Sequence, residues 1–321
     1  MSLASSADNI RYNGTGRCYA GALGGASFDD LGDLEDFKFS MSISTEKLKT
    51  NRNAAKATIL EVESGREASL GFGLREMTNE NLKMALLAEN INIQNQSAGN
   101  EYQAVPAFID DLYIDLGHLN IFITKLTGTI TGTLAAGDTI TGETSSATGK
   151  IAFVGSDFVE LVNVAGTFQA GEQVYKTQDT DYITPSGIET LHDLVVTDAA
   201  GTTRRVNGTD YSVDPDYGYI RKLSTGSVSD TDVVSYDYES VDKKYIWSMA
   251  GGSVQKKLIF VSDKNDQGPR QRWTFHKVQI NLDGDFPLIG TGAAILSVKA
   301  TVLADTSQPS GQEYFKTEII G

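Results

Sequence analysis

The stretch "FKFSMSI", residues 37–43, alternates apolar and polar side chains along its whole length. Such a period of two is typical of a half-buried β-strand. Its apolar members, which share one side of an extended chain, are Phe37, Phe39, Met41 and Ile43. "ATILEVES" (57–64) and "ASLGFGL" (68–74) continue the alternation, so the first third of the chain is predicted to be a β-domain.

The same pattern returns near the C-terminus. "KKLIFVSD" (256–263), "RWTFHKVQINLDGD" (272–285) and "AAILSVKATVLAD" (293–305) each read as a strand with polar turns around it. The 321 residues include 32 glycines and only 6 prolines, a composition that suits many tight turns between strands. The sequence therefore predicts a mainly β protein.

One segment, "TNENLKMALLAEN" (78–90), predicts a helix. Thr78 is a suitable N-cap and Glu80 lies near the positive end of the helix dipole. The apolar side chains expected on one stripe are Leu82, Met84, Ala85, Leu86 and Leu87. A helix of about a dozen residues is marginal alone in water, so we expect its apolar stripe to pack on a sheet.

The middle of the chain has two further sequence patterns. "GTLAAGDTI" (132–140) and "GTFQAGEQV" (166–174) match in pattern at an offset of 34 residues, which predicts a duplicated β-unit over 125–180. Short strands separated by glycine turns predict a second β-module over 186–242.

The predicted organisation is therefore a discontinuous domain, 1–124 plus 243–321, with two small inserted β-domains. Residues 1–35 are polar and glycine-rich and are predicted to form an arm that neighbouring molecules would order.

Charge is distributed unevenly along the chain, whose net charge is −15. Residues 1–124 carry 10 basic and 17 acidic side chains, residues 125–242 carry 7 and 18, and residues 243–321 carry 10 and 7. This acidity argues against wrapping nucleic acid or lying on an anionic membrane. Opposite patches on one chain also suit an interface between copies.

Two features indicate where the protein is made. The single cysteine, Cys18, excludes an intramolecular disulfide and a CxxC metal site. "MSLASSADNIRY" (1–12) shows no secretory pattern, and no run of about 18 apolar residues could span a membrane. The sequence predicts synthesis in a reducing cytoplasm and no membrane partner.

No active site is visible. His118, His192 and His276 lie far apart in the sequence, and Cys18 has no histidine near it. "GETSSATGKI" (142–151) lacks the glycine and hydroxyl positions of a phosphate-binding loop and is predicted to be a turn. We expect no enzyme activity, no catalytic residue and no cofactor.

Two acidic turns, at Asp263 and Asp283, could bind a cation weakly. Asp263 begins a stretch like the start of a calcium loop, but its twelfth position is Thr274 instead of glutamate. Asp283 lies in "NLDGD" (281–285). Turn chemistry explains both, and no metal site is expected.

The order of these features resembles the major tail protein, or tail tube protein, of long-tailed bacteriophages. "LGDLEDFKFSMSISTEKLKT", the strands of 57–74 and the short helix resemble one end of that family, and "RWTFHKVQINLDGDFPLIGTGAAILSVKATVLAD" is similar to its closing strands. The segment "VNGTDYSVDPDYGYIRKLSTGSVSDTDVVSYDYE" looks like a β-module often inserted in such proteins.

The resemblance implies a tail-tube-like β-sandwich or barrel with one flanking helix. It also implies a structural virion protein that self-assembles into stacked, hexameric rings. The hollow phage tail tube so formed would pass double-stranded DNA without binding it specifically. Other implied partners are the tape measure, tail tip and terminator proteins. The implied location is the virion, after synthesis in the bacterial host cytoplasm.

The contacts between subunits are predicted at Gly21–Gly25 and at Tyr314–Phe315. An alternative function is that of a phage adhesin or carbohydrate-binding tail protein, in which the 13 tyrosines, Trp247 and Trp273 would stack on sugar rings. The tube of a type VI secretion or contractile injection system shares the implied fold. An enzyme is the third alternative.

Overall fold

A computed structural model describes residues 15–52, 58–105, 109–263 and 270–320. Within them the chain is mainly β, as predicted, with a single short helix. The chain forms two compact units, Met1–Asn92 with Tyr245–Gly321 (unit 1) and Ile93–Lys244 (unit 2). It leaves unit 1 in β5 (Ile91–Ile93) and returns in β18 (Lys244–Ile246), and these two strands pair with each other.

The predicted domain boundaries differ from these units at one end. The sequence places the first boundary after residue 124, whereas unit 1 ends at Asn92. The intervening strands β6 (Gly99–Ala104) and β7 (Tyr113–Asp115) belong to unit 2 because they pair with its strands β17 (Val233–Tyr238) and β16 (Tyr219–Lys222). These strands are short and mostly exposed, so they carry little hydrophobic pattern.

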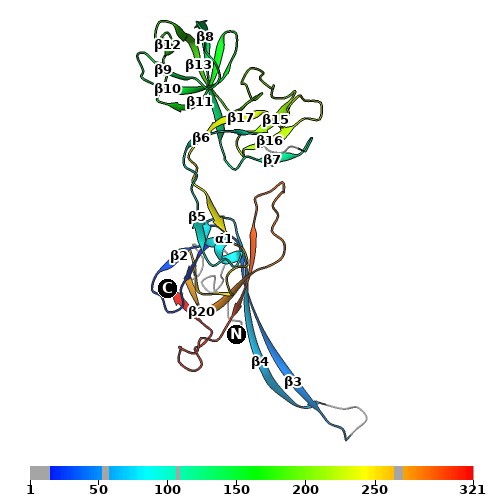
Figure 1. Cartoon of the computed structure of the whole chain (residues 1–321). Helices are drawn as coiled ribbons and strands as arrows, with labels where there is room; N and C mark the ends of the chain where they lie inside the picture. Colours follow the sequence, from blue (N-terminus) through cyan, green and yellow to red (C-terminus); the bar gives the residue numbers. More distant parts are fainter. Residues whose placement is uncertain (1–14, 53–57, 106–108, 264–269, 321) are drawn as a thin grey trace. The chain divides into compact units, whose positions relative to one another are not determined.

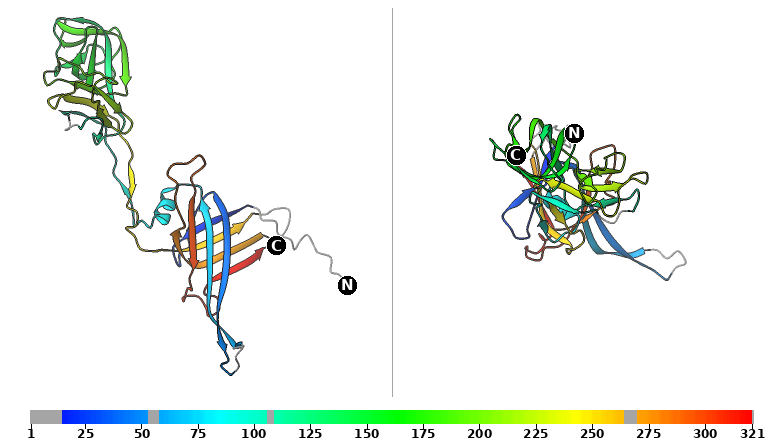
Figure 2. Two further views of the ribbon diagram at one scale, coloured as in Figure 1. Left: turned by 90° about the vertical axis from the view of Figure 1, so that its right-hand side faces the viewer. Right: turned by 45° about the horizontal axis from the view of Figure 1, so that its top comes forward.

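Unit 1 is built on one eight-stranded sheet in the order β2-β1-β19-β20-β21-β4-β3, with β22 also paired to β20. Figure 2 shows these strands side by side, with β3 and β4 continuing past the others as a long two-stranded ribbon. The bounds are β1 (Gly16–Gly21), β2 (Phe28–Asp30), β3 (Leu34–Lys49), β4 (Thr58–Leu74), β19 (Val254–Ser262), β20 (Arg270–Leu282), β21 (Leu296–Val302) and β22 (Phe315–Ile320).

The sheet of unit 1 curls around its own core. Phe37 of β3 stacks on Phe260 of β19 with ring centroids 4.8 Å apart, although several strands separate β3 from β19 in the sheet order. Phe39 of β3 meets Phe315 of β22 edge to face at 5.1 Å. The alternation that predicts a strand at 37–43 thus places the first two aromatic side chains in the core.

The prediction that residues 1–35 form an arm is wrong for the part that the structure describes, because β1 and β2 belong to this sheet. Residues 1–14 lie outside the described residues, but β1 lies inside the sheet between β2 and β19, with Cys18 fully buried. β1 belongs to the fold because its apolar side chains pack into the core of unit 1. The glycines at both ends of "GRCYAG" masked this strand pattern in the sequence.

The helix begins where predicted and ends early. In α1 (Asn79–Ala85) the Thr78 hydroxyl accepts a hydrogen bond from the Asn81 amide at 3.2 Å. Leu87 then takes a left-handed conformation (φ 53°), and the Ala88 amide donates to the Lys83 carbonyl at 2.9 Å, which terminates the helix. Met84 and Ala85 are buried in the core of unit 1, so the helix packs on the sheet as expected.

Part of unit 2 is a closed six-stranded barrel. Its order is β11-β10-β9-β12-β13-β8, and β8 pairs again with β11 to complete the circle. The strands are β8 (Ile121–Thr131), β9 (Thr139–Gly142), β10 (Thr148–Val154), β11 (Phe158–Ala165), β12 (Val174–Thr177) and β13 (Asp181–Leu191). The barrel therefore extends beyond the duplicated unit predicted over 125–180.

The sequence repeat recurs in the contacts of this barrel. The Gly137 amide donates to the Ile151 carbonyl and the Gly171 amide to the Pro185 carbonyl, both at 2.7 Å. The donor and the acceptor of the second bond each lie 34 residues after those of the first. Leu134 and Phe168, which also correspond, are both buried in the barrel core. The two halves of the repeat thus share these two contacts.

The rest of unit 2 packs on a second core. β14 (Val195–Thr197) and β6 flank β17, and β15 (Tyr211–Asp214), β16 and β7 form a separate three-stranded sheet. The fully buried side chains of this core include Tyr211, Ile220 and Tyr236.

Glu172, in the second half of the repeat, joins two turns of the barrel by hydrogen bonds. The buried Glu172 carboxylate accepts hydrogen bonds from the amides of Gln169, Thr144 and Ser145 and from the Ser145 hydroxyl, at 2.7–3.0 Å. The turn that superficially resembles a phosphate-binding loop therefore holds a carboxylate. Burial would raise the pKa of Glu172, but these hydrogen bonds outweigh it and lower the pKa.

We expect Glu172→Ala to destabilise the barrel by about 3 kcal/mol, because several amides lose a charged acceptor. The matched control is Asp138→Ala at the corresponding position, where the carboxylate accepts from the Ala135 amide and pairs with exposed Lys176; we expect about 1 kcal/mol there. Hydrogen exchange should show faster amide exchange at Thr144 and Ser145 in the first variant alone. Equal effects of both variants would contradict this assignment.

Candidate self-association surface

An apolar groove lies at the base of the β3–β4 ribbon in unit 1. Its cavity volume is about 330 Å³. It is lined by Met41, Ser42, Ile43, Arg66, Glu67, Ala68, Tyr314 and Phe315. Tyr314 and Phe315 are the C-terminal contact residues predicted from the sequence, and the structure brings them together with Met41 and Ile43.

The groove arises because the apolar face of β3 continues past the core. Phe37 and Phe39 pack on the core of unit 1, but Met41 is 65% exposed and Ile43 is 63% exposed. Across the ribbon, Met41 pairs with Ala68 and Ile43 with Arg66. The second half of this apolar face, Met41 and Ile43, is therefore not covered by other residues of the same chain.

The ribbon also offers an open strand edge. β3 stands at the end of the sheet order, so the described residues supply no strand for its outer edge over Leu34–Lys49. A long strand edge with exposed apolar side chains favours pairing with another chain.

The two faces of the outer ribbon differ in chemistry. On one face Thr45 donates to Glu61, Lys47 lies 3.4 Å from the same carboxylate, and Arg66 pairs with Glu63. The opposite face carries exposed apolar side chains. They are Leu48, which pairs with Leu60, and Val62, which pairs with Glu46.

Unit 1 exposes further apolar side chains in the loop between β20 and β21. Ile289 is 97% exposed, and Leu288 beside it is nearly as exposed. Monomeric proteins rarely leave several such groups uncovered, and contiguous apolar patches mark interaction surfaces.

The other predicted contact segment, Gly21–Gly25, follows β1 as a tight turn. The Gly25 amide donates to the Ala22 carbonyl at 3.1 Å, and Gly24 has a positive φ of 70°. Gly21 pairs with Phe28 of β2. The segment therefore joins two strands of unit 1, and the structure does not bring it to the groove residues.

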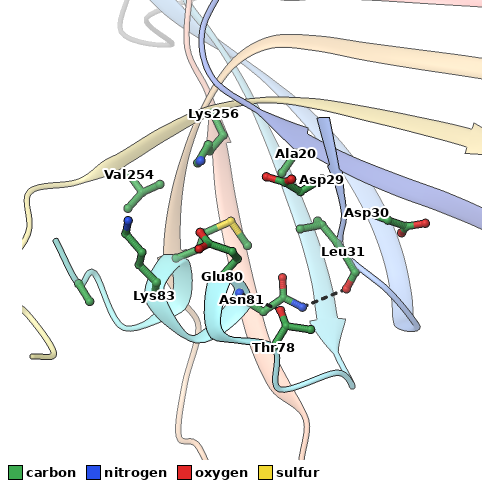
Figure 3. A pocket seen from close by; sticks show the side chains of 12 residues that line it. Ala20, Asp29, Asp30, Leu31, Thr78, Glu80, Asn81, Lys83, Val254 and Lys256 are labelled. Atoms are coloured by element: carbon green, nitrogen blue, oxygen red, sulfur yellow. Dashed lines mark hydrogen bonds between the residues drawn. The ribbon is translucent and has the colours of Figure 1, made fainter. Parts of the chain in front are cut away.

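A second cavity lies between α1 and the sheet of unit 1, with a volume of about 80 Å³. Figure 3 shows Lys83, Lys256 and Glu80 around it. The Asn81 side-chain amide donates to the Leu31 and Glu76 carbonyls at 3.0 and 2.9 Å. The first bond attaches the helix to the segment after β2 and the second to the segment that precedes the helix, so Asn81 beside this small cavity serves the fold.

The residues considered for chemistry are not brought into a site. His118 and His192 belong to unit 2, whereas His276 belongs to unit 1. His118 instead stacks on Tyr238 at 3.8 Å and hydrogen-bonds to the Tyr236 hydroxyl. Burial raises the pKa of the Cys18 thiol to about 12, which keeps it protonated and a poor nucleophile.

The acidic turns give no metal centre among the residues that the structure describes, which contain no group of three or more histidine, cysteine, aspartate or glutamate side chains placed to hold an ion. The Asp283 amide donates to the Ser297 carbonyl, which continues the pairing of β20 with β21. Most of the stretch after Asp263 lies outside the described residues.

In the same described ranges, no helix is long and apolar enough to cross a membrane. No curated protein matches the chain. A protein-family model does match, over residues 11–154 and 158–317, which include nearly all of both units. The chain belongs to the family described as "protein of unknown function UCP028589".

Proposed function

We propose that this protein is a structural subunit that self-assembles into closed rings, and that the β3–β4 ribbon and the groove at its base join neighbouring copies. The observation that carries the proposal is the uncovered apolar stripe, Met41 and Ile43, beside Tyr314 and Phe315. Burying such side chains contributes about 1.5–3 kcal/mol each.

The ribbon and the groove are different surfaces of one chain. Contact between them in two copies would be head-to-tail, and a head-to-tail contact repeats until it closes into a ring or extends as a filament. The open edge of β3 would add backbone hydrogen bonds to the same interface. These features support an assembling function more directly than a catalytic one.

The resemblance to phage tail tube proteins suggests which assembly the rings would belong to. In that form six copies close into a ring, and the rings stack into the hollow tail tube of a virion and contact tape measure, tail tip and terminator proteins. Unit 1 has 18 basic and 20 acidic side chains, a net of −2, whereas unit 2 has 9 and 22, a net of −13. A nearly neutral wall built of unit 1 would let double-stranded DNA slide, because its acidic side chains balance the attraction of its cations to phosphate.

The experiment that tests the proposal is a measurement of particle mass by light scattering over a concentration series, combined with negative-stain electron microscopy. We expect hollow rings or stacked tubes to appear as concentration rises. A compact trimer would contradict the ring and favour the adhesin. A protein that remains monomeric at the highest concentration reached would contradict self-association through the exposed stripe.

A further inference from the structure

The small sheet of β15, β16 and β7 in unit 2 has one buried and one open face. On the buried face Tyr211 and Ile220 are fully covered, and Ile114 packs against the same core. Since side chains alternate along a strand, the residues between them lie on the opposite face. These strands lie side by side in Figure 1.

The open face is made of two cross-strand rows. Register places Ser212 beside Arg221 and Arg221 beside Tyr113 in the first row. In the second row the ring of Tyr219 lies between two carboxylates, Asp214 on β15 and Asp115 on β7. This face therefore offers rings, carboxylates, a guanidinium and a hydroxyl, and no aliphatic side chain.

The hairpin turn after β15 extends this face with another ring. Tyr217 is exposed and stacks on Tyr219, with ring centroids 6.2 Å apart and planes 14° apart. The turn is fixed to the rest of unit 2 by three hydrogen bonds, in which the amides of Leu116, Asn120 and Ile121 donate to carbonyls of the turn.

The approach of this turn to its neighbours is close. Gly218 has a φ of 66°, and a Cβ at this position would lie 1.8 Å from the His118 carbonyl oxygen. Only glycine fits here, so the backbone that carries the two stacked tyrosines is held against the His118 segment before any ligand arrives. A surface ordered in advance loses less entropy on binding.

Two polar atoms on this face have no hydrogen-bond partner among the described residues. They are Nε of Arg221 and Oγ of Ser212, which are neighbours in the first row and are both buried. The Arg221 guanidinium lies over the Tyr113 ring at 5.0 Å. Unpaired buried polar atoms are costly, and those in native proteins call for an explanation such as an unfilled partner position.

We propose that this open face binds a neutral polysaccharide of hexopyranose units. A pyranose ring has an apolar C–H face that suits the tyrosine rings, and a rim of hydroxyls that can both donate to Asp115 and Asp214 and accept from Arg221. A small rotation of Tyr113 would open the row beneath it to such hydroxyls. This inference is independent of ring assembly by unit 1.

Charge and composition favour this ligand over two others. The net charge of −13 on unit 2 repels polyanions such as nucleic acid or acidic glycans. The cores of protein–protein interfaces are depleted of aspartate, whereas here each side of the central ring has one.

The test is saturation-transfer NMR and calorimetry on the full chain with three soluble probes, maltohexaose, cellohexaose and mannohexaose. We expect at least one to bind, with saturation transferred to its ring protons. Tyr219→Ala should weaken that binding at least about tenfold, because a stacked ring is lost. Tyr245→Ala is the matched control, since Tyr245 in unit 1 and Tyr219 are both 39% exposed, and it should bind like the wild type.

Three results would overturn the proposal. The first is no binding of any of the three hexasaccharides at millimolar concentration. The second is an equal loss of binding in the Tyr245→Ala control. The third is a change in particle mass, instead of glycan affinity, in Tyr219→Ala, which would identify the face as a protein interface. The first two readouts measure glycan binding and do not depend on whether the rings form, so this proposal and the assembly proposal fail separately.

Discussion

Replacing Met41 and Ile43 together with aspartate is expected to leave unit 1 folded and to weaken association between copies at least about a hundredfold. Both side chains are largely exposed in the single chain, so the change removes little of its core. In the proposed interface they are buried, and each aspartate would replace a favourable apolar contact with an unpaired charge. Particle mass over a concentration series measures the loss.

The control for this variant is Ser297→Asp with Thr301→Asp. Both residues are exposed on the outward side of β21 in the same sheet, so the control adds the same charge without touching the groove. Trp273, which packs near Phe39, reports by its fluorescence whether the core of unit 1 is intact. Loss of association in both double variants, or in neither, would contradict the assignment of the groove.

Arg205→Ala is expected to destabilise unit 2 by about 3–5 kcal/mol, the largest effect that we expect from a single substitution away from the apolar cores. Two guanidinium nitrogens of Arg205 bond the two carboxylate oxygens of Asp232 at 2.6 and 3.0 Å. Asp232 is only 1% exposed, so the variant leaves a buried carboxylate without its cation. The measurement is urea unfolding.

The two units can be followed separately in this experiment. Both tryptophans, Trp247 and Trp273, belong to unit 1, so tryptophan fluorescence should keep its midpoint while circular dichroism shows an earlier transition. Arg205→Met combined with Asp232→Leu should recover most of the stability, because removing a buried pair as a whole leaves no unpaired charge. Failure of this double variant to recover would show that the pair is needed for more than mutual neutralisation.

The sequence predicted the elements whose pattern is local. Alternation at 37–43 and the N-cap Thr78 both correspond to the observed strand and helix start. The end of the helix was missed because Leu87 adopts a left-handed conformation that usually signals its position with glycine. The 34-residue repeat predicted a compact β-unit, but closure into a barrel depends on the long-range pairing of β8 with β11.

The candidate site was predicted only in part. Tyr314 and Phe315 were predicted as contact residues, and both line the groove. Met41 and Ile43 read as ordinary strand residues, because periodicity shows that a face is apolar and does not show whether the same chain covers it. The sheet that carries Tyr219 was similarly hidden, since β7 comes from more than a hundred residues before β16.

A cryo-electron microscopy map of the assembled wild-type protein would show directly whether copies of unit 1 join through the ribbon and groove. We expect a closed hollow ring in which the β3–β4 ribbon of each copy contacts Met41, Ile43, Tyr314 and Phe315 of the next. A map in which these four side chains face solvent, or in which the particle is a compact trimer without a channel, would contradict it.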